Sequence, residues 1–448
     1  MQIIADLEVH SKYARAVSPQ MTPENISLWA GKKGIGLVGT GDFTHPMWLR
    51  ELEANLEEAG DGVFRLRKSK ETPLFLLTSE VSCIYSHRGK GRRVHILVYL
   101  PNFASVKKFN SELTARGANL FSDGRPIIGL TLSQVAEIAL NVEPKAIIIP
   151  AHVWTPWFGF YGHLGGYDSL EEAFGEMAKS IYAIETGLSS DPAMNWRIEE
   201  LENRNIVSFG DAHSPQKLGR EATIFEISGQ SSELSYELVR EAVTGLSSNN
   251  KPLRAKIAYT IEFYPEEGKY HYTGHRKCGV VYSPNEARKM GITCPVCGKQ
   301  LTFGVMSRVE SLASYDVETE SVTDEFGVRW IKPASDAKGP RPGRRPYVML
   351  VPLMEIIAEV LKVGVGTQQV SIVYDQLINA FDSEFSVLLT TSVEAMQKVA
   401  DSRIVEGIKK VRSGNIVIEP GYDGIFGKVK IWREEEKEKN AIDQATLF

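Results

Sequence analysis

The 448-residue sequence has no apolar run approaching the roughly 20 residues that a membrane-spanning helix requires. Its first ten residues, MQIIADLEVH, reach charged side chains at once and leave no room for the apolar core of a signal peptide. We therefore expect a cytoplasmic protein without a membrane partner. Neither sign of charge dominates, because 51 lysines and arginines face 56 acidic residues and give a formal net charge of −5. Any DNA-binding surface must then be a local basic patch.

Cysteine is also scarce, with four residues in the chain. Three of them, Cys278, Cys294 and Cys297, are close together in the sequence, and the last two form a CxxC pair. In a cytosolic chain this spacing favours zinc over a disulfide. With His275 as the fourth ligand, two knuckles would close a tetrahedral, structural Zn²⁺ site. His271 is an alternative to His275, and unmetallated cysteines in a loop are the alternative to the site itself.

Residues 1 to about 230 alternate short apolar runs with helical stretches. Such runs predict buried parallel strands joined by helical crossovers, and six or seven units of this kind suggest a (β/α) barrel. The runs are 35–39, 73–77, 94–99, 146–150, 181–184 and 206–209. Polar residues cluster just after these runs, and the C-terminal ends of barrel strands share one face. We therefore expect these polar side chains to converge at one mouth of the barrel.

The chain also divides by composition. A catalytic domain is predicted for residues 1–250, a small zinc-binding domain for 251–317, and a linker rich in proline, glycine and charge for 318–346. Residues 347–432 carry helical apolar patterns and are predicted to form a mainly helical DNA-binding domain. Residues 433–448 form a charged tail that is predicted to be flexible.

Eight histidines and acids at or next to the predicted strands are candidate metal ligands. Glu8 and His10 are two apart on a strand, so alternation directs both to one face, and Asp211 and His213 repeat this arrangement. The full set is Glu8, His10, Asp42, Glu80, His95, His152, Asp211 and His213. A single histidine is more often an ordinary core or surface residue. That explanation cannot hold independently for four histidines and four acids in this pattern.

Imidazoles mixed with carboxylates suit Zn²⁺, Mn²⁺ or Fe²⁺. Several metals a few ångströms apart suit phosphodiester hydrolysis, because one lowers the pKa of the attacking water while the others neutralise the phosphate and the leaving oxygen. We choose Glu80 as the carboxylate that bridges two metals, and we assign catalytic roles to Glu80, Asp211 and His213.

The ordered motifs resemble those of the PHP (polymerase and histidinol phosphatase) superfamily over roughly residues 1–230. The matching runs are Asp-Leu-Glu-Val-His-Ser, Gly-Thr-Gly-Asp, Ser-Glu, His-Ile-Leu, Pro-Ala-His and Gly-Asp-Ala-His. The resemblance implies an α/β fold with a distorted seven-stranded (β/α) barrel that holds two or three divalent metals, Zn²⁺, Mn²⁺ or Mg²⁺. This chain departs from the superfamily pattern at two places. Glu8 stands in a motif that is usually His-x-His, and Asp42 stands where many members have histidine.

Longer runs are similar to the endonuclease Q family and extend the resemblance to nearly the whole chain. They are HSKYARAVS (10–18), GTGDFTHP (39–46), PAHVWTPWFG (150–159) and ETGLSSDP (185–192). The resemblance implies a nucleoid-associated repair endonuclease that acts on damaged double- or single-stranded DNA. It would cut on the 5′ side of a deaminated base (uracil, hypoxanthine or xanthine) or an abasic site.

Five aromatic residues lie between His152 and His163. An enzyme that inspects a base must extrude it and stack it against flat side chains. Trp154, Trp157 and Phe158 are therefore predicted to contact the extruded base or to fill the space it leaves. The alternative is a hydrophobic loop packed on the barrel.

Residues 86–93 read SHRGKGRR and carry four fixed positive charges among glycines. Glycine lets a backbone approach a phosphate closely, and arginine and lysine bind it. Contacts with DNA are therefore predicted for Arg88, Lys90, Arg92 and Arg93. An ordinary solvated hairpin turn is the alternative.

The last five residues, QATLF, resemble short peptides that dock into sliding clamps. Gln444, Leu447 and Phe448 would be the anchors in a clamp pocket, and a chance match in a disordered tail is the alternative.

Two other functions compete with a repair endonuclease. A small-molecule phosphatase of the histidinol-phosphatase kind would use the same barrel, but it would need neither the zinc knuckles nor the arginine-rich run. A non-catalytic DNA-binding module would result if Glu8 made the metal site defective.

Overall fold

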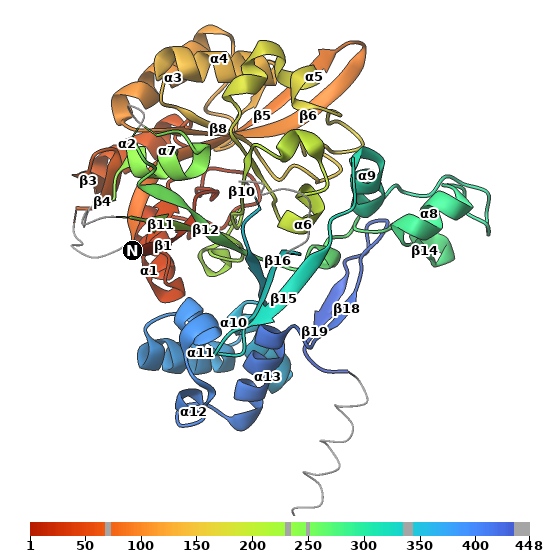
Figure 1. Ribbon diagram of the computed structural model, residues 1–448. Helices are drawn as coiled ribbons and strands as arrows, with labels where there is room; N and C mark the ends of the chain where they lie inside the picture. Colours follow the sequence, from red (N-terminus) through yellow and green to blue (C-terminus); the bar gives the residue numbers. More distant parts are fainter. Residues whose placement is uncertain (68–72, 229–233, 248–250, 335–343, 434–448) are drawn as a thin grey trace, which may run out of the picture. The chain divides into compact units, whose positions relative to one another are not determined.

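The computed structural model describes residues 1–67, 73–228, 234–247, 251–334 and 344–433. The chain forms two compact units. Unit 1 comprises Met1–Glu262, Arg308–Glu320 and Lys332–Tyr347, and unit 2 comprises Phe263–Ser307, Ser321–Ile331 and Val348–Phe448. Unit 1 is a mixed α/β fold built on a large sheet (Figure 1).

Three neighbouring strands in the sheet of unit 1 are parallel. They are β1 (Gln2–Asp6), β2 (Leu37–Gly39) and β5 (Leu74–His87). Helix α1 (Pro23–Lys33) joins the first two. It begins where the Thr22 side chain accepts the backbone N–H of Asn25, and it ends at Gly34, whose φ of 88° suits glycine. The crossover that the apolar runs predict is therefore present here.

Strand β6 (Lys90–Leu100) pairs antiparallel with β5, so the prediction of a parallel strand at 94–99 is wrong in direction. The cause is a two-residue turn at Arg88 and Gly89, which both have positive φ (52° and 76°). Such a turn matches the twist of a β-hairpin and returns the chain alongside itself. Strand β8 (Ile147–Pro150) pairs antiparallel with β6 and therefore runs in the direction of β5.

The remaining predicted strands are β9 (Ala183–Glu185) and β10 (Asn205–Val207), which pair in parallel. A few backbone hydrogen bonds beyond the strand ends link them to their neighbours. The N–H of Val153, beyond β8, donates to the carbonyl of Glu185 at 3.1 Å. The N–H of His10, beyond β1, donates to the carbonyl of Ala212, beyond β10, also at 3.1 Å. These bonds bring the carboxyl ends of the strands together.

Other elements complete unit 1. Strand β11 (Ala222–Ile227) pairs antiparallel with β1 and with β12 (Ala255–Glu262). The other helices and strands are α2 (Pro46–Asn55), β3 (Leu56–Gly60), β4 (Val63–Leu66), α3 (Phe103–Ala115), β7 (Ile127–Ile128), α4 (Leu132–Val142), α5 (Leu170–Phe174), α6 (Pro192–Asn195) and α7 (Tyr236–Thr244).

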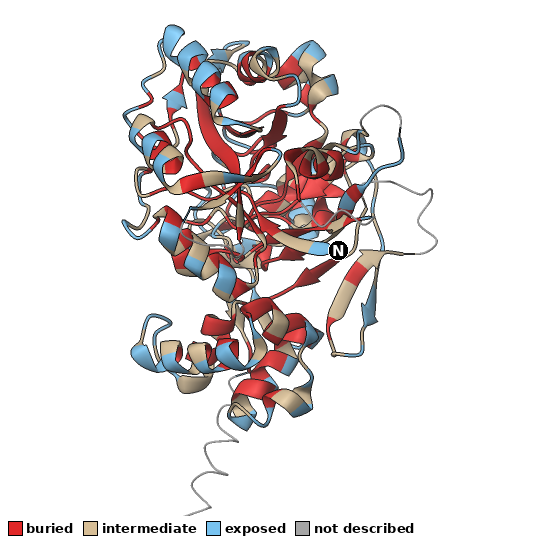
Figure 2. Ribbon diagram, turned by 90° about the vertical axis from the view of Figure 1, so that its left-hand side faces the viewer, coloured by how far each residue is buried: buried red, intermediate tan, exposed pale blue. Residues whose placement is uncertain are grey.

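The core of unit 1 lies among these strands and α7. Leu37, Leu76, Leu97, Ile149 and Val207 are fully or almost fully buried and belong to one apolar cluster. The strands of this unit are largely buried on both faces, whereas its outer helices expose one side (Figure 2). Burial of this kind explains why the strands read as continuous apolar runs.

Unit 2 contains the cysteine-rich region and a group of helices. The first part has β13 (Thr273–His275), β14 (Val280–Tyr282) and α8 (Pro284–Met290). The second has α10 (Leu353–Leu361), α11 (Gln368–Phe381), a π-helix at Ser386–Thr390, α12 (Val393–Met396), α13 (Ser402–Ser413), β18 (Val417–Glu419) and β19 (Lys428–Lys430). Arg412 is buried in this part, and its guanidinium donates to the carbonyls of Val387, Leu388 and Thr391 around the end of the π-helix.

The predicted domain limits need correction at two places. The stretch predicted as a linker carries two strands, β15 (Thr319–Thr323) and β16 (Arg329–Pro333), and residues 335–343 lie outside the described part. The region predicted as a zinc domain begins and ends in unit 1, because β12 and residues 308–317 belong there. Proline and glycine content could not reveal these two short strands.

Among the described helices, none is both long enough and apolar enough to cross a membrane.

Candidate active site

Seven of the eight predicted metal ligands gather in one place: Glu8, His10, His152, Asp211 and His213 follow strands, whereas Glu80 and His95 lie in the middle of β5 and β6. Their ligand atoms form three overlapping groups, each within 4.8 Å: His10, Asp211 and His213; Glu80, His95 and His152; and Glu8, Glu80 and Asp211. Because Glu80 and Asp211 each belong to two groups, the three groups form one continuous cluster. The convergence predicted from the strand ends is therefore found in the structure.

Backbone conformation helps to aim these side chains. Asp42, His152 and Asp211 all have positive φ, at 47°, 27° and 45°. Non-glycine residues rarely adopt this region, and it persists only where the surrounding structure enforces it. Each of the three follows a strand closely, so the unusual turn redirects the chain just where a functional side chain is needed.

Glu80, on β5, lies at the centre of the cluster. Its Oε1 contacts Nδ1 of His95 and lies 3.0 Å from Nε2 of His152. Its Oε2 lies 3.1 Å from Nε2 of His10 and 3.0 Å from Nη1 of Arg125. The two oxygens thus face different imidazoles, which is the arrangement that a bridging carboxylate requires.

Asp42 lies outside these groups, and both of its oxygens have other partners. Oδ1 lies 3.0 Å from Nδ1 of His10, while Oδ2 accepts the backbone N–H and the hydroxyl of Ser11 at 2.6 and 2.7 Å. A carboxylate bound to one ring nitrogen of histidine fixes which nitrogen faces a metal. Asp42 therefore orients His10 so that Nε2 points towards Glu80 and Asp211.

Several buried atoms in the cluster make no hydrogen bond of good geometry among the described residues: both carboxylate oxygens of Glu8, Nε2 of His10, Oδ1 of Asp211 and Oε1 of Glu185. Two of these atoms lie close together, because Nε2 of His10 is 3.0 Å from Oδ1 of Asp211 and 3.1 Å from Oε2 of Glu80. Buried polar atoms are nearly always paired, since desolvation without a partner is costly. Oxygen and imidazole donors facing one space suit divalent cations, so the residues present fit a metal cluster.

Burial and crowding shift the pKa values of these groups apart. Burial raises the pKa of Glu185 to about 7, and burial together with the neighbouring Glu185 and Asp211 raises that of Glu8 well above its usual range. Burial lowers the pKa of His95 to about 4, which keeps its ring neutral and able to bind a metal. For Glu80, burial favours the neutral form, but His95 and Arg125 outweigh it and hold the pKa well below normal. Carboxylates crowded together in a buried site favour the entry of a cation.

Three residues of the site were not predicted from the sequence. Glu185 ends β9, and one of its oxygens accepts the backbone N–H of His152. Arg125 contacts Glu80 from a loop. Asp6 accepts the N–H groups of Gly210 and Gly219 and so fixes the loop that carries Asp211. Glu185 had a visible signal, an acid at the end of an apolar run, whereas Arg125 follows no predicted strand.

The predicted aromatic contacts differ in exposure. Trp154 is buried, stacks on Tyr161 and donates its indole N–H to Asn195 at 2.7 Å. Trp157 is 36% exposed. The Phe158 ring lies 4.7 Å from the His95 ring, and its backbone carbonyl accepts the His95 N–H. Trp154 therefore packs the loop itself, whereas Trp157 is exposed and Phe158 is partly buried against His95.

The basic hairpin also divides into two kinds of residue. Arg88, Lys90 and Arg93 are exposed. Arg92 is buried, bonds to Glu172 at 2.7 Å and to the carbonyl of Gly166, and lies 3.9 Å from the centre of the Tyr167 ring. The prediction that Arg92 contacts DNA is therefore wrong, because its charge is used inside unit 1.

In unit 2, His275, Cys278, Cys294 and Cys297 bring their ligand atoms within 4.8 Å of one another. Nδ1 of His275 lies 3.4 Å from Sγ of Cys297. His271, the alternative ligand, is buried, and burial lowers its pKa to about 4; it does not join this group. Three thiols and one imidazole suit tetrahedral zinc without an open position.

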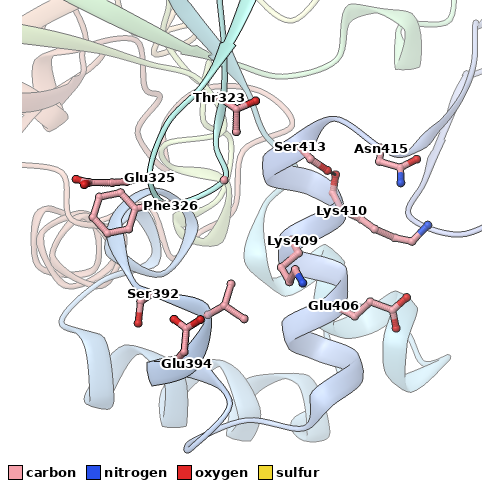
Figure 3. A pocket seen from close by; sticks show the side chains of 12 residues that line it. Thr323, Glu325, Phe326, Ser392, Glu394, Glu406, Lys409, Lys410, Ser413 and Asn415 are labelled. Atoms are coloured by element: carbon pink, nitrogen blue, oxygen red, sulfur yellow. Dashed lines mark hydrogen bonds between the residues drawn. The ribbon is translucent and has the colours of Figure 1, made fainter.

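A separate hollow of about 550 Å³ lies among α12, α13 and the turn between β15 and β16 (Figure 3). Its lining includes Glu325, Glu394 and Glu406 as well as Lys409 and Lys410. Three carboxylates against two lysines do not give the positive charge that binding of DNA phosphates needs. This hollow therefore adds nothing to a DNA-binding surface.

Comparison with known proteins places these features in context. Residues 352–415 match the family described as the MJ0043 C-terminal domain. Over 96% of its length the chain is 30% identical to the uncharacterized protein YqxK of Bacillus subtilis and covers 99% of that protein. It is also 30% identical to the uncharacterized protein MJ0043 of Methanocaldococcus jannaschii, but the match covers 63% of this chain and 32% of that protein.

Two solved structures resemble the whole chain. The lesion-specific endonuclease PfuEndoQ from Pyrococcus furiosus superposes with a TM-score of 0.78 at 31% identity, covering 98% of this chain and 99% of the other. A complex of endonuclease Q with a 27-mer duplex substrate, which has an abasic lesion at the active site, gives a TM-score of 0.78 at 32% identity, covering 97% and 98%.

Proposed function

The chain belongs to the endonuclease Q family, and from this we infer that it is a DNA repair endonuclease that depends on divalent metals. We propose that it cuts the phosphodiester on the 5′ side of an abasic site or of a deaminated base, namely uracil, hypoxanthine or xanthine. The observation that carries the proposal is the set of buried oxygen and imidazole atoms that face one another closely between Glu8, His10, Glu80 and Asp211.

We assign the cluster to two or three divalent ions, Zn²⁺, Mn²⁺ or Mg²⁺. Such ions, when bound, lower the pKa of a water molecule and neutralise charge on the phosphate and the leaving oxygen. The protein itself holds the candidate ligands in position. Glu80 offers one oxygen to each side of the cluster, Asp42 holds the ring of His10, and Glu185 holds the backbone of His152.

The phosphate is proposed to approach at Asp211 and His213. Their side chains are 25% and 34% exposed, whereas those of Glu80 and His10 are almost completely buried. Asp211 and His213 therefore mark the open side of the cluster. With Glu80, they remain our choice for the residues nearest the reaction.

Recognition of DNA is assigned to two surfaces of unit 1. Arg88, Lys90 and Arg93 are exposed on the hairpin that also carries His95, so they are suited to bind backbone phosphates near the cluster. Trp157 and Phe158 follow His152 in the chain, where they can contact an extruded base or its vacated position.

Other parts are given supporting roles. We interpret β1, β2, β5, β6, β8, β9 and β10 as the seven strands of the predicted barrel, since strand pairing and a few backbone bonds beyond the strand ends link them in that order. The four-ligand group of unit 2 is proposed to bind structural zinc, and residues 347–432 to support binding of the duplex. The clamp-binding motif Gln444–Phe448 lies outside the described residues and stays a prediction.

Nicking assays test the function directly. End-labelled duplexes with one uracil, hypoxanthine, xanthine, abasic site or normal base are incubated with the protein and Mn²⁺, Mg²⁺ or Zn²⁺. We expect a single cut 5′ to each lesion, loss of cutting in Asp211→Asn and normal cutting in Asp61→Asn, which changes an exposed aspartate. Equal cutting of undamaged DNA would contradict lesion specificity. Phosphate release from small monoesters without nicking would favour a phosphatase, and binding without turnover would favour a non-catalytic module.

A further inference from the structure

Arg125 is an unusual neighbour for a metal cluster. Its Nη1 lies 3.0 Å from Oε2 of Glu80, and its side chain remains 23% exposed although that of Glu80 is only 1% exposed. Among the described residues, no other hydrogen bond of this guanidinium is found. Arg125 thus connects the buried cluster to solvent and keeps Nε and Nη2 available for a second acceptor.

The loop that carries Arg125 is held against the cluster. A Cβ on Gly124 would lie 2.4 Å from Oδ2 of Asp42 and 2.9 Å from the backbone nitrogen of Ala14, so only glycine fits there. The Gly124 N–H donates to the carbonyl of Tyr13 at 3.0 Å, and its carbonyl accepts the hydroxyl of Thr44 at 3.1 Å. The position of Arg125 is therefore fixed by packing rather than left to a mobile loop.

Asp123 places a second arginine beside the first. Its Oδ1 accepts the backbone N–H groups of both Arg125 and Arg15, at 3.1 and 3.2 Å, and its Oδ2 lies 3.4 Å from Nε of Arg15. Asp123 itself is buried, whereas the Arg15 side chain is 75% exposed. One buried carboxylate thus organises two arginines that are far apart in the sequence.

The nearby Lys12 does not share this arrangement. Its Nζ is a single charged atom that lies 3.0 Å from Oε2 of Glu51 and over the Tyr13 ring. Arg15 also has an acidic partner, but its Nε lies 3.4 Å from Asp123 and its side chain is 75% exposed. Arg125 bonds to Glu80 through Nη1 and keeps Nε and Nη2 available. Arg15 and Arg125 are therefore the cations at this edge of the cluster that are best placed to meet an incoming anion.

We propose that Arg125 and Arg15 form a phosphate-binding pair, in which Arg125 contacts the scissile phosphate and Arg15 a neighbouring phosphate of the same strand. The proposal rests on the proposed function, and it names residues that position the phosphodiester over the cluster. Arginine suits this role because its planar guanidinium can bond to Glu80 on one side and to a phosphate oxygen on another. The arrangement stabilises charge at the reacting phosphate, and such donors act strongly in a partly buried site.

The test compares Arg125→Ala, Arg125→Lys and Arg15→Ala with the wild type loaded with Mn²⁺. Arg116→Ala is the matched control, because Arg116 is an exposed arginine at the end of α3 that pairs with Glu112 and does not contact the cluster. We expect Arg125→Ala to lower the single-turnover nicking rate on the order of 100-fold while metal content by mass spectrometry stays unchanged. Arg125→Lys should recover only part of that loss, since lysine lacks the planar fork.

Arg15→Ala is expected to weaken binding of the duplex and to reduce the slope of log Kd against log salt by about 0.9, as loss of one phosphate contact predicts. The control should change neither quantity. An unchanged rate in Arg125→Ala, or an unchanged slope in Arg15→Ala, would overturn the respective assignment. Loss of bound Mn²⁺ in both Arg125 variants would overturn the phosphate role in favour of a role in holding Glu80.

Binding of inorganic phosphate separates this proposal from the proposed function. Calorimetric titration of Mn²⁺-loaded protein with phosphate should show weaker binding in Arg125→Ala than in the wild type. If the wild type fails to nick any lesion but this difference is present, the endonuclease assignment fails and the phosphate site stands. If the wild type nicks normally and Arg125→Ala matches it in rate and in phosphate affinity, the site fails and the function stands.

Discussion

Asp42 bonds to Nδ1 of His10 at 3.0 Å and thereby turns the opposite ring nitrogen towards Glu80 and Asp211. The aspartate therefore acts on the cluster through the histidine. Both of its oxygens have partners in the protein, because its other oxygen accepts hydrogen bonds from the backbone N–H and the hydroxyl of Ser11.

Asp42→Asn should weaken metal binding without unfolding the protein. An amide cannot hold the imidazole in the same tautomer as firmly, and loss of such a partner typically costs 10–100-fold in metal affinity. Competition titration with a metal-sensitive dye measures this change, and circular dichroism checks the fold. Asp61→Asn should bind metal like the wild type. Unaltered affinity in Asp42→Asn would show that His10 needs no partner to stay oriented.

Removal of metal should abolish nicking while leaving unit 1 folded. The core of this unit is apolar and does not include the cluster, so a chelator should lower the melting temperature without unfolding the protein at 25 °C. Readdition of Mn²⁺, Mg²⁺ or Zn²⁺ in turn should restore cutting to different degrees, which identifies the working ion. Full activity after dialysis against chelator, with no metal found by mass spectrometry, would refute a metal mechanism.

Cys294→Ser should release one zinc ion per chain and destabilise unit 2. Three thiolates and one imidazole contribute folding energy only when the metal closes the site. Zinc content and limited proteolysis followed by mass mapping would detect the change between residues 263 and 307. Cys83→Ala is the control, because Cys83 is buried in β5 and lies outside the four-ligand group. Equal zinc content in Cys294→Ser and Cys83→Ala would show that Cys294 does not bind zinc.

The two tryptophans of the aromatic loop should respond differently to replacement by alanine. Trp157→Ala should slow nicking of lesion-bearing DNA with little effect on stability, since the side chain is 36% exposed. Trp154→Ala should cost about 3–5 kcal/mol of unfolding free energy, because its ring is buried and bonded to Asn195. Denaturant titration and single-turnover assays separate the two effects. Normal cutting by Trp157→Ala would exclude this residue from lesion recognition.

Glu262 should make stability depend on pH. Burial raises the pKa of its carboxyl to about 8, and one oxygen accepts the hydroxyls of Ser208 and Thr260. Between the ordinary value of 4.5 and about 8 the folded state holds a proton that the unfolded state has lost, so stability falls as pH rises through this window. Glu262→Gln removes this dependence and should raise the melting temperature by several degrees at pH 8.5 but little at pH 5. Equal shifts at both pH values would contradict the assignment.

Much of the site could be predicted because its residues obey simple rules of position. Glu8, His10, Asp211 and His213 follow apolar strands, and strand ends meet when the strands pair side by side. A hairpin turn at residues 86–93 was only the alternative in the sequence analysis, because an Arg-Gly turn is a weak hairpin signal beside Asn-Gly. It leaves His95 on the correct strand, so the error in direction did not move the ligand away.

Other residues escaped prediction for physical reasons. Arg92 looked like a surface charge within a basic run, yet it shares the alternating face of Val94 and Ile96 and points into the protein. Arg125 reaches the cluster from a loop whose course depends on packing against Asp42, which periodicity cannot reveal. The strand-end rule finds ligands that arrive on strands, and it is blind to side chains that arrive from the rim.

The path of the chain between the two units has a practical consequence. It passes from one to the other after residues 262, 307, 320, 331 and 347, so neither unit is encoded by a single continuous segment. A stop codon after residue 262, 307, 320 or 331 would discard pieces of both units, whereas one after residue 347 would remove only the last segment of unit 2. Expression of either unit alone therefore requires several segments of the chain to be joined.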